Sequence, residues 1–132
     1  MKTVITAAVM FLAVIVFVWV NFNVLNNFFD ETNELLVGLP TTVEEVEGMD
    51  QAQLAGVNER LEKIHMGWKE RETYISLSLE HSVSREFLNA FLPAVAYFNT
   101  RSYPEFLAQI KLARDTLEHL IFDESLKLGN IL

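Results

Sequence analysis

The feature that most constrains the fold is an apolar segment at the N-terminus. No charged residue occurs between Thr3 and Phe29, and residues 4–20 include only one hydroxyl side chain, Thr6. A helix over residues 4–20 rises roughly 25 Å, and one that continues to residue 25 exceeds the ~30 Å thickness of a bilayer's hydrocarbon core. We therefore expect residues 1–25 to be a transmembrane anchor that contacts the lipid bilayer through residues 4–25.

The distribution of basic residues predicts the orientation of this anchor. Lys2 precedes the apolar segment, and no further Lys or Arg occurs until Arg60. Because basic residues favour the cytoplasmic side, we expect the N-terminus in the cytoplasm and the rest of the chain outside, in a single-pass protein of the cell membrane. Trp19 stands where the apolar run ends, as an aromatic residue at the membrane interface does.

A cleaved secretory signal is the competing interpretation of this segment. Such a signal has an apolar region of about 7–15 residues, followed by small residues at the cleavage site. Here the run is longer, and bulky residues (Val18, Trp19, Val20) follow where the small ones would stand. The sequence favours an uncleaved anchor.

Composition narrows the possible functions. The chain has 132 residues, a net charge of −8 and no cysteine. Nucleic acid is not an expected partner, because binding it requires a basic surface. Disulfides, thiolate chemistry and cysteine-based metal sites are excluded.

The pattern after the anchor predicts an all-α protein. Apolar residues at three-four spacing predict that the first helix continues over 26–37 as a stalk, until the glycine and proline of residues 38–40 end it. Residues 38–49 are acidic and predict a linker. Residues 50–124 predict a small antiparallel three-helix bundle. The alternating stretch 74–79 is ambiguous between strand and helix, and we interpret it as helix because no partner strand occurs elsewhere.

Two capping patterns mark helix starts inside the bundle. Asp50 with Gln53 three residues later predicts one start, and Ser102 with Glu105 predicts another. The apolar stripe of the last helix ends at about Phe122.

Residues 125–132 then predict an apolar C-terminal tail. Four large aliphatic residues occur in the last seven positions, although exposed chain ends are usually polar. The tail either folds back over the open end of the bundle, which is the simpler interpretation, or docks into a partner. The aliphatic residues are Leu126, Leu128, Ile131 and Leu132.

The order of these features resembles a known family. An anchor helix is followed by a helix ending in Trp68, by His81 thirteen residues later, by Glu118-His119 and by an Asn-Ile-Leu terminus. This is similar to the short single-pass membrane proteins grouped as domain-of-unknown-function family 4363, from Gram-positive, often spore-forming, bacteria. One departure is that Ser82-Val83-Ser84-Arg85 stands where the family has acidic residues. The resemblance implies a bacterial, membrane-anchored, helical protein and implies no reaction.

No motif in the chain predicts catalysis. Glu62-x-x-His65 has the spacing of two metal ligands on one helical face, but a di-iron bundle needs a second such pair, which the sequence lacks. No glycine-flanked nucleophile, phosphate-binding loop or dinucleotide fingerprint is present. We therefore expect neither an enzyme nor a bound cofactor or metal.

The remaining candidate residues are structural or interaction residues. Trp68 closes an apolar helical stripe, which predicts a structural anchor, and His81 and His119 are the other residues singled out. The sequence favours a non-catalytic accessory protein of the bacterial cell envelope that docks on another membrane or envelope protein. The alternative is a ligand-sensing bundle that acts through a separate membrane partner, since only Met1–Thr3 remain on the cytoplasmic side for output.

Overall fold

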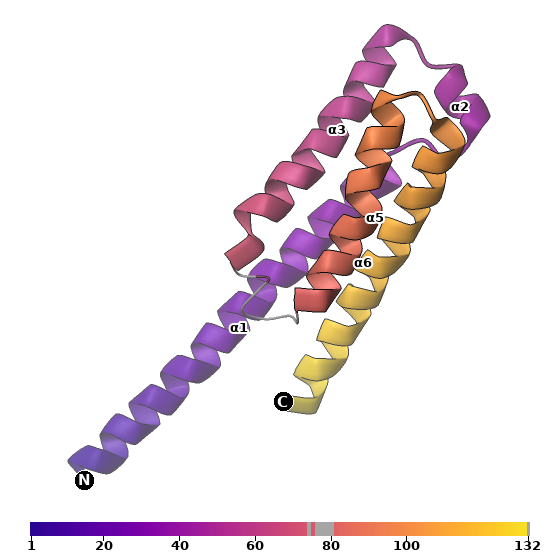
Figure 1. The fold of residues 1–132 in the computed structure, drawn as a ribbon. Helices are drawn as coiled ribbons and strands as arrows, with labels where there is room; N and C mark the ends of the chain where they lie inside the picture. Colours follow the sequence, from indigo (N-terminus) through magenta and orange to yellow (C-terminus); the bar gives the residue numbers. More distant parts are fainter. Residues whose placement is uncertain (74, 76–80, 132) are drawn as a thin grey trace.

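The computed structural model describes residues 1–73, 75 and 81–131 and is helical, with no strand in these ranges. The all-α prediction is confirmed. The helices are α1 (Lys2–Val37), α2 (Val43–Glu47), α3 (Gln51–Glu70), α5 (His81–Asn99) and α6 (Tyr103–Ile131) (Figure 1). The stretch 74–79 lies outside the described residues except for Ile75, which is buried.

Helix α1 is one uninterrupted helix with two different environments. Its residues 2–20 are all exposed, whereas Leu25, Phe28, Phe29 and Leu36 are buried. The continuity predicted from the sequence is confirmed. The helix ends at Val37, and the backbone N–H of its C-cap residue, Gly38, donates to the Glu34 carbonyl at 3.2 Å.

The second half of α1 differs from the expected stalk over 26–37. It packs against α3 and α6 and forms part of the same core as the other helices. The physical reason is the width of its apolar stripe, because two adjacent phenylalanines, Phe28 and Phe29, are stabilised when other helices cover both of them. Among the residues that the structure describes, the bundle therefore has four long helices, and α1 supplies one of them.

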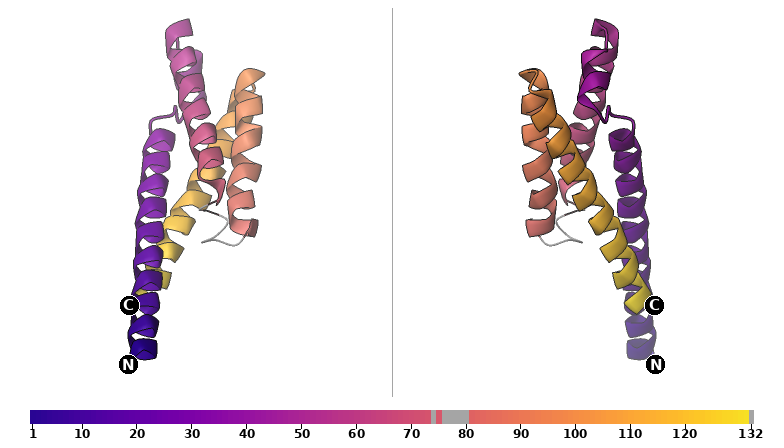
Figure 2. Two further views of the ribbon diagram at one scale, coloured as in Figure 1. Left: turned by 90° about the vertical axis from the view of Figure 1, so that its left-hand side faces the viewer. Right: turned by 90° about the vertical axis from the view of Figure 1, so that its right-hand side faces the viewer.

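The four long helices follow each other around the core in the order α3, α1, α6, α5. Contacts join α3 to α1, α1 to α6 and α6 to α5. Figures 1 and 2 show that both chain ends lie at the same end of the molecule, because α6 runs antiparallel to α1. The short α2 lies at the opposite end, where its Val46 is buried.

The predicted start of α3 is confirmed in detail. The Asp50 carboxylate accepts from the Gln53 backbone N–H at 2.8 Å, and the Gln53 side chain accepts from the Asp50 N–H at 3.0 Å. This reciprocal pair satisfies two of the N–H groups that a helix start leaves without partners. The helix then passes through Gly56 and Gly67 without a break.

Helices α5 and α6 form a hairpin closed by a tight turn. Ser102 N–H donates to the Tyr97 carbonyl at 2.8 Å, and Arg101 N–H donates to the Phe98 carbonyl at 3.1 Å. This is the Schellman pattern, in which glycine usually occupies the left-handed position. Here Arg101 occupies it, with φ of 62°.

The end of α6 corrects the sequence prediction. The helix was expected to stop near Phe122 and give way to a tail over 125–132, but it continues to Ile131. No proline follows, and the single glycine, Gly129, costs only about 1 kcal/mol inside a helix. The tail residues Leu126, Leu128 and Ile131 are therefore helical residues of α6, and Leu132 lies outside the described range.

Candidate functional site

A cluster of aromatic rings around Trp68 joins three helices. The Trp68 ring centroid lies 5.5 Å from that of Phe28 and 6.0 Å from that of Phe29 on α1, and 4.1 Å from that of Phe87 on α5. Its indole N–H donates to Ser84 Oγ at 3.1 Å. With 1% of its surface exposed, Trp68 lies in the core.

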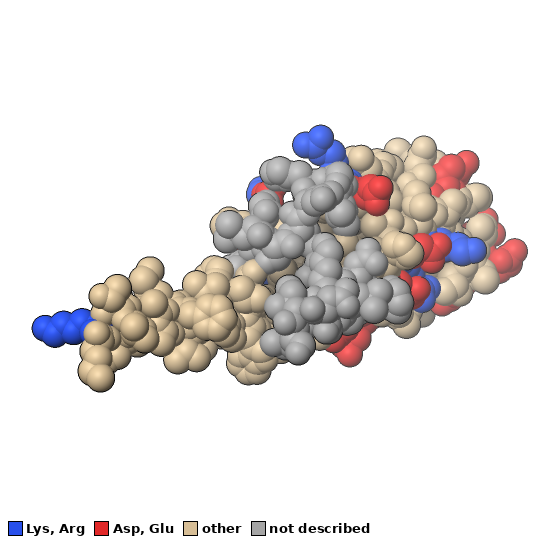
Figure 3. All heavy atoms as spheres, turned by 90° about the horizontal axis from the view of Figure 1, so that it is seen from below, with Lys and Arg blue, Asp and Glu red and all other residues tan. Residues whose placement is uncertain are grey.

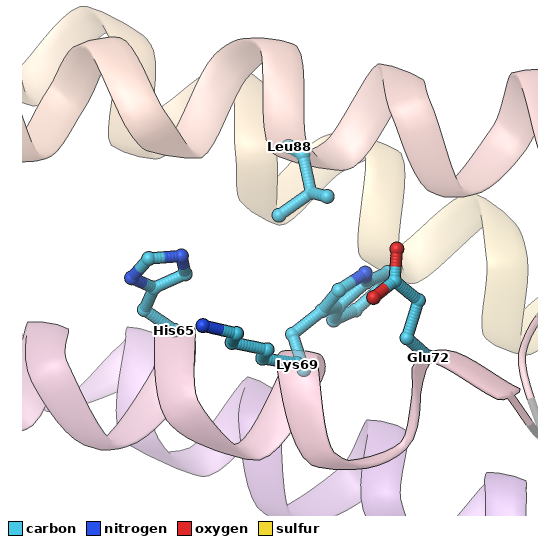
Figure 4. A pocket seen from close by; sticks show the side chains of 5 residues that line it. His65, Lys69, Glu72 and Leu88 are labelled. Carbon is cyan, nitrogen blue, oxygen red and sulfur yellow. The ribbon is translucent and has the colours of Figure 1, made fainter.

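The rings of this cluster fill the space between α3 and α5, so the backbones of the two helices do not pack closely against each other. The two helices meet through large rings, including His65 of α3 and Phe91 of α5 with centroids 6.5 Å apart. A hollow of about 220 Å³ opens beside the rings. Figure 4 shows His65 reaching up from α3 and Leu88 reaching down from α5 toward each other across it. Its lining residues are His65, Trp68, Lys69, Glu72 and Leu88.

A second hollow, of about 270 Å³, lies at the other end of the same helix pair. It is formed between the first half of α3 and the turn that joins α5 to α6. Its lining residues are Gln51, Leu54, Ala55, Asn58, Phe98, Asn99, Arg101 and Tyr103. The two hollows share no lining residue, and we refer to them jointly as the α3–α5 groove.

The chemistry of the groove suits contact with another chain. Apolar groups (Leu54, Leu88, Phe98) line it beside charged and amide groups, a mixture typical of surfaces that bind a helix or loop. Of the described residues, no group of three His, Asp or Glu side chains is placed to hold a metal ion. His65, which the sequence placed in a possible ligand pair with Glu62, instead lines the groove.

Among the other predicted interaction residues, only His119 has a side chain that the structure describes, and it does not line this groove. His119 is exposed on α6, far along the chain from Trp68 and absent from both linings. His81 is the first residue of α5, and the structure describes only its backbone. The residues Leu126, Leu128 and Ile131 lie on the last turns of α6.

The predicted interface residues lie on the exposed half of α1. Lys2 is at its tip, and Trp19 is 58% exposed just before the bundle begins. Figure 3 shows a single basic group at the tip of this projecting part, whereas acidic and basic residues are scattered over the visible face of the bundle. Within the described residues α1 is the one helix long and apolar enough to cross a membrane, and its most apolar window is not buried at all in the structure.

Sequence reasoning missed the groove. No sequence pattern predicts that Lys69, Glu72 and Leu88 line one hollow. Their proximity depends on the distance between α3 and α5, which the rings of Trp68 and Phe87 set. The signal that existed was the pair of large aromatic residues at core positions of α3 and α5, which indicates wide helix spacing but not which residues line the gap.

These features define an all-helical bundle protein with one long, apolar, N-terminal helix. The model of the family described as Domain of unknown function (DUF4363) matches residues 22–131, and the chain belongs to this family. The match begins where α1 enters the bundle, so the second half of α1 is part of the family's domain. No curated protein and no solved structure matches the chain.

Proposed function

We propose that this protein is a membrane-anchored, non-catalytic accessory protein of the bacterial cell envelope that binds another membrane or envelope protein. The observation that carries the proposal is the division of α1 into an exposed apolar half and a buried half within one helix. Exposed aliphatic side chains over twenty residues are costly in water and favourable in lipid. The bundle is then held directly at the membrane surface.

The proposed topology has the N-terminus in the cytoplasm and the bundle outside. It is supported by the absence of Lys and Arg between Lys2 and Arg60. Reporter fusions after Leu132 test it. We expect a phosphatase that works only outside the cytoplasm to be active, and a fluorescent protein that matures only in the cytoplasm to stay dark. The opposite pattern, or a mature N-terminus near Asn23 by mass spectrometry, contradicts the proposal.

The α3–α5 groove is the surface we propose for the partner protein. It combines apolar groups with His65, Lys69 and Glu72, and the two helices that border it, α3 and α5, make few direct backbone contacts. A photoreactive amino acid at His65 should crosslink a specific protein in native membranes. The matched control is the same amino acid at Leu112, which is 54% exposed on α6 and lines neither hollow. Equal labelling from both positions contradicts a role for the groove.

A second candidate function, a ligand-sensing bundle, is supported by the hollow beside Trp68. Its 220 Å³ is slightly below the size of drug-like ligand sites, about 300–1,000 Å³. The two functions differ in what protects the groove. The test adds a protein-free extract of the cell envelope before the photoreactive amino acid at position 65 is activated. If the protein is a sensor, small molecules in the extract should occupy the hollow and reduce crosslinking from this position. If it is an accessory protein, the extract should leave the crosslinking unchanged.

A further inference from the structure

The C-terminal end of α6 extends beyond the rest of the bundle. In Figures 1 and 2 it passes the end of α3 and the start of α5, and it runs toward the N-terminal end of α1. The core reaches Leu25 on α1 and includes Leu120 on α6. From Leu120 to Ile131 the helix continues for roughly 16 Å.

This extension reaches the level of the predicted membrane interface. On α1, only about 9 Å of helix separates Leu25 from Trp19, where the apolar run ends. Because α6 runs antiparallel to α1, its last turns lie beside the part of the molecule that the bilayer surrounds under the proposed function. A helix in this position meets lipid head groups or water.

The sequence of the extension favours lipid over water. Residues 126–132 contain four large aliphatic residues and a single charged side chain, Lys127. The acidic residues of the extension, Asp123 and Glu124, come earlier, nearer the bundle. The residues that favour lipid are therefore farthest from the bundle along the helix, and the acidic residues that favour water are nearer to it.

We propose that residues 121–131 of α6 are a second membrane-contacting element, which enters the interfacial region of the lipid bilayer beside α1. This inference rests on the proposed function, because it requires α1 to be embedded in that bilayer. The contact is apolar rather than electrostatic, since Lys127 is the only basic residue in the segment. It would give the molecule two attachment points in the bilayer, which would limit the tilt of the bundle relative to the membrane plane.

The absence of cysteine allows a clean test with the full chain. Leu128→Cys and Leu126→Cys each carry an environment-sensitive fluorophore, in phospholipid vesicles that contain a lipid with a quencher near the carbonyl groups. Two sites are used because residues two apart on a helix face different sides. The control is Leu112→Cys, on the part of α6 that lies in the bundle.

We expect the quencher lipid to remove most of the emission at residue 126 or 128 and little at 112, with no change in high salt. Flotation of the vesicles measures the anchor separately. A chain that floats with the vesicles but shows no more quenching at 126 and 128 than at 112 overturns the second contact and leaves the anchor intact. The tail would then cover protein, either α1 or a partner. A chain that does not float overturns both.

Discussion

The indole ring of Trp68 stacks on the ring of Phe87, with centroids 4.1 Å apart and planes 18° from parallel. This contact joins α3 to α5, two helices that otherwise border a groove, and Phe28 of α1 packs against the same indole. One side chain therefore connects the buried half of α1 to the two helices that form the proposed docking surface.

Replacing Trp68 should be the most damaging single change in the core. We expect Trp68→Ala to lower the free energy of unfolding by about 3–5 kcal/mol, because the lost ring leaves a cavity between three helices. Ser84→Ala removes only the acceptor of the indole N–H and should cost about 1 kcal/mol. Denaturant titration of the full chain in detergent micelles measures both. Equal effects of the two changes would place the contribution of Trp68 in its hydrogen bond instead of its packing.

The second half of α1 should be indispensable for folding. A fragment of residues 38–132 lacks Leu25, Phe28, Phe29 and Leu36, each of which contributes about 1.5–3 kcal/mol by burial. Their sum is comparable with the whole stability of a small domain, about 5–15 kcal/mol. We expect a fragment of residues 22–132 to melt cooperatively by circular dichroism and the 38–132 fragment not to. If both fragments melt in similar cooperative transitions, residues 26–37 are a stalk outside the folded domain, as the sequence predicted.

Glycine at position 101 should stabilise the α5–α6 hairpin. Arg101 has φ of 62°, a conformation that costs a residue with a Cβ atom about 1–2 kcal/mol. Glycine removes this strain, but it also raises the conformational entropy of the unfolded chain. The entropy increase cancels about 0.5–1 kcal/mol of the stabilisation. We expect Arg101→Gly to raise the melting temperature. Arg101→Ala keeps a Cβ atom and should not, so a gain with alanine would show that the arginine side chain itself is unfavourable.

Alanine at position 56 should also be stabilising, for a different reason. A Cβ atom added at Gly56 meets nothing within 4 Å, so the change alters only helix propensity, by about 0.8–1.0 kcal/mol. At Gly67 the added atom would lie 3.4 Å from Phe28 Cε2, an ordinary contact with the α1 side of the core. Thermal melts of Gly56→Ala and Gly67→Ala should both shift upward. A loss at Gly67 alone would mean that α1 and α3 pack more tightly than an extra methyl allows.

The sequence predicted those parts of the fold that depend on neighbouring residues. The continuity of α1, the Asp50 cap and the start of α6 at Tyr103 follow from local periodicity and capping. What could not be predicted depends on contacts between distant residues. The apolar stripe that includes Phe28 and Phe29 is compatible with both a stalk and a helix of the bundle. Its packing partner, Trp68, is forty positions away in the sequence, so local periodicity does not distinguish the two. The groove depends on ring packing between α3 and α5, which no local pattern encodes.

The uninterrupted path of α1 from its exposed half into the core fixes the rotational orientation of the bundle about the axis of that helix. With no hinge between Val20 and Leu25, the direction in which the α3–α5 groove faces is set by the rotation of the apolar half about its own axis. Each residue of an α-helix turns about 100° and rises about 1.5 Å. One residue added between these positions would therefore turn the groove by about 100° around the axis of the exposed half and shift it by only about 1.5 Å along that axis. Under the proposed function, the groove would then face a different neighbour in the plane of the membrane.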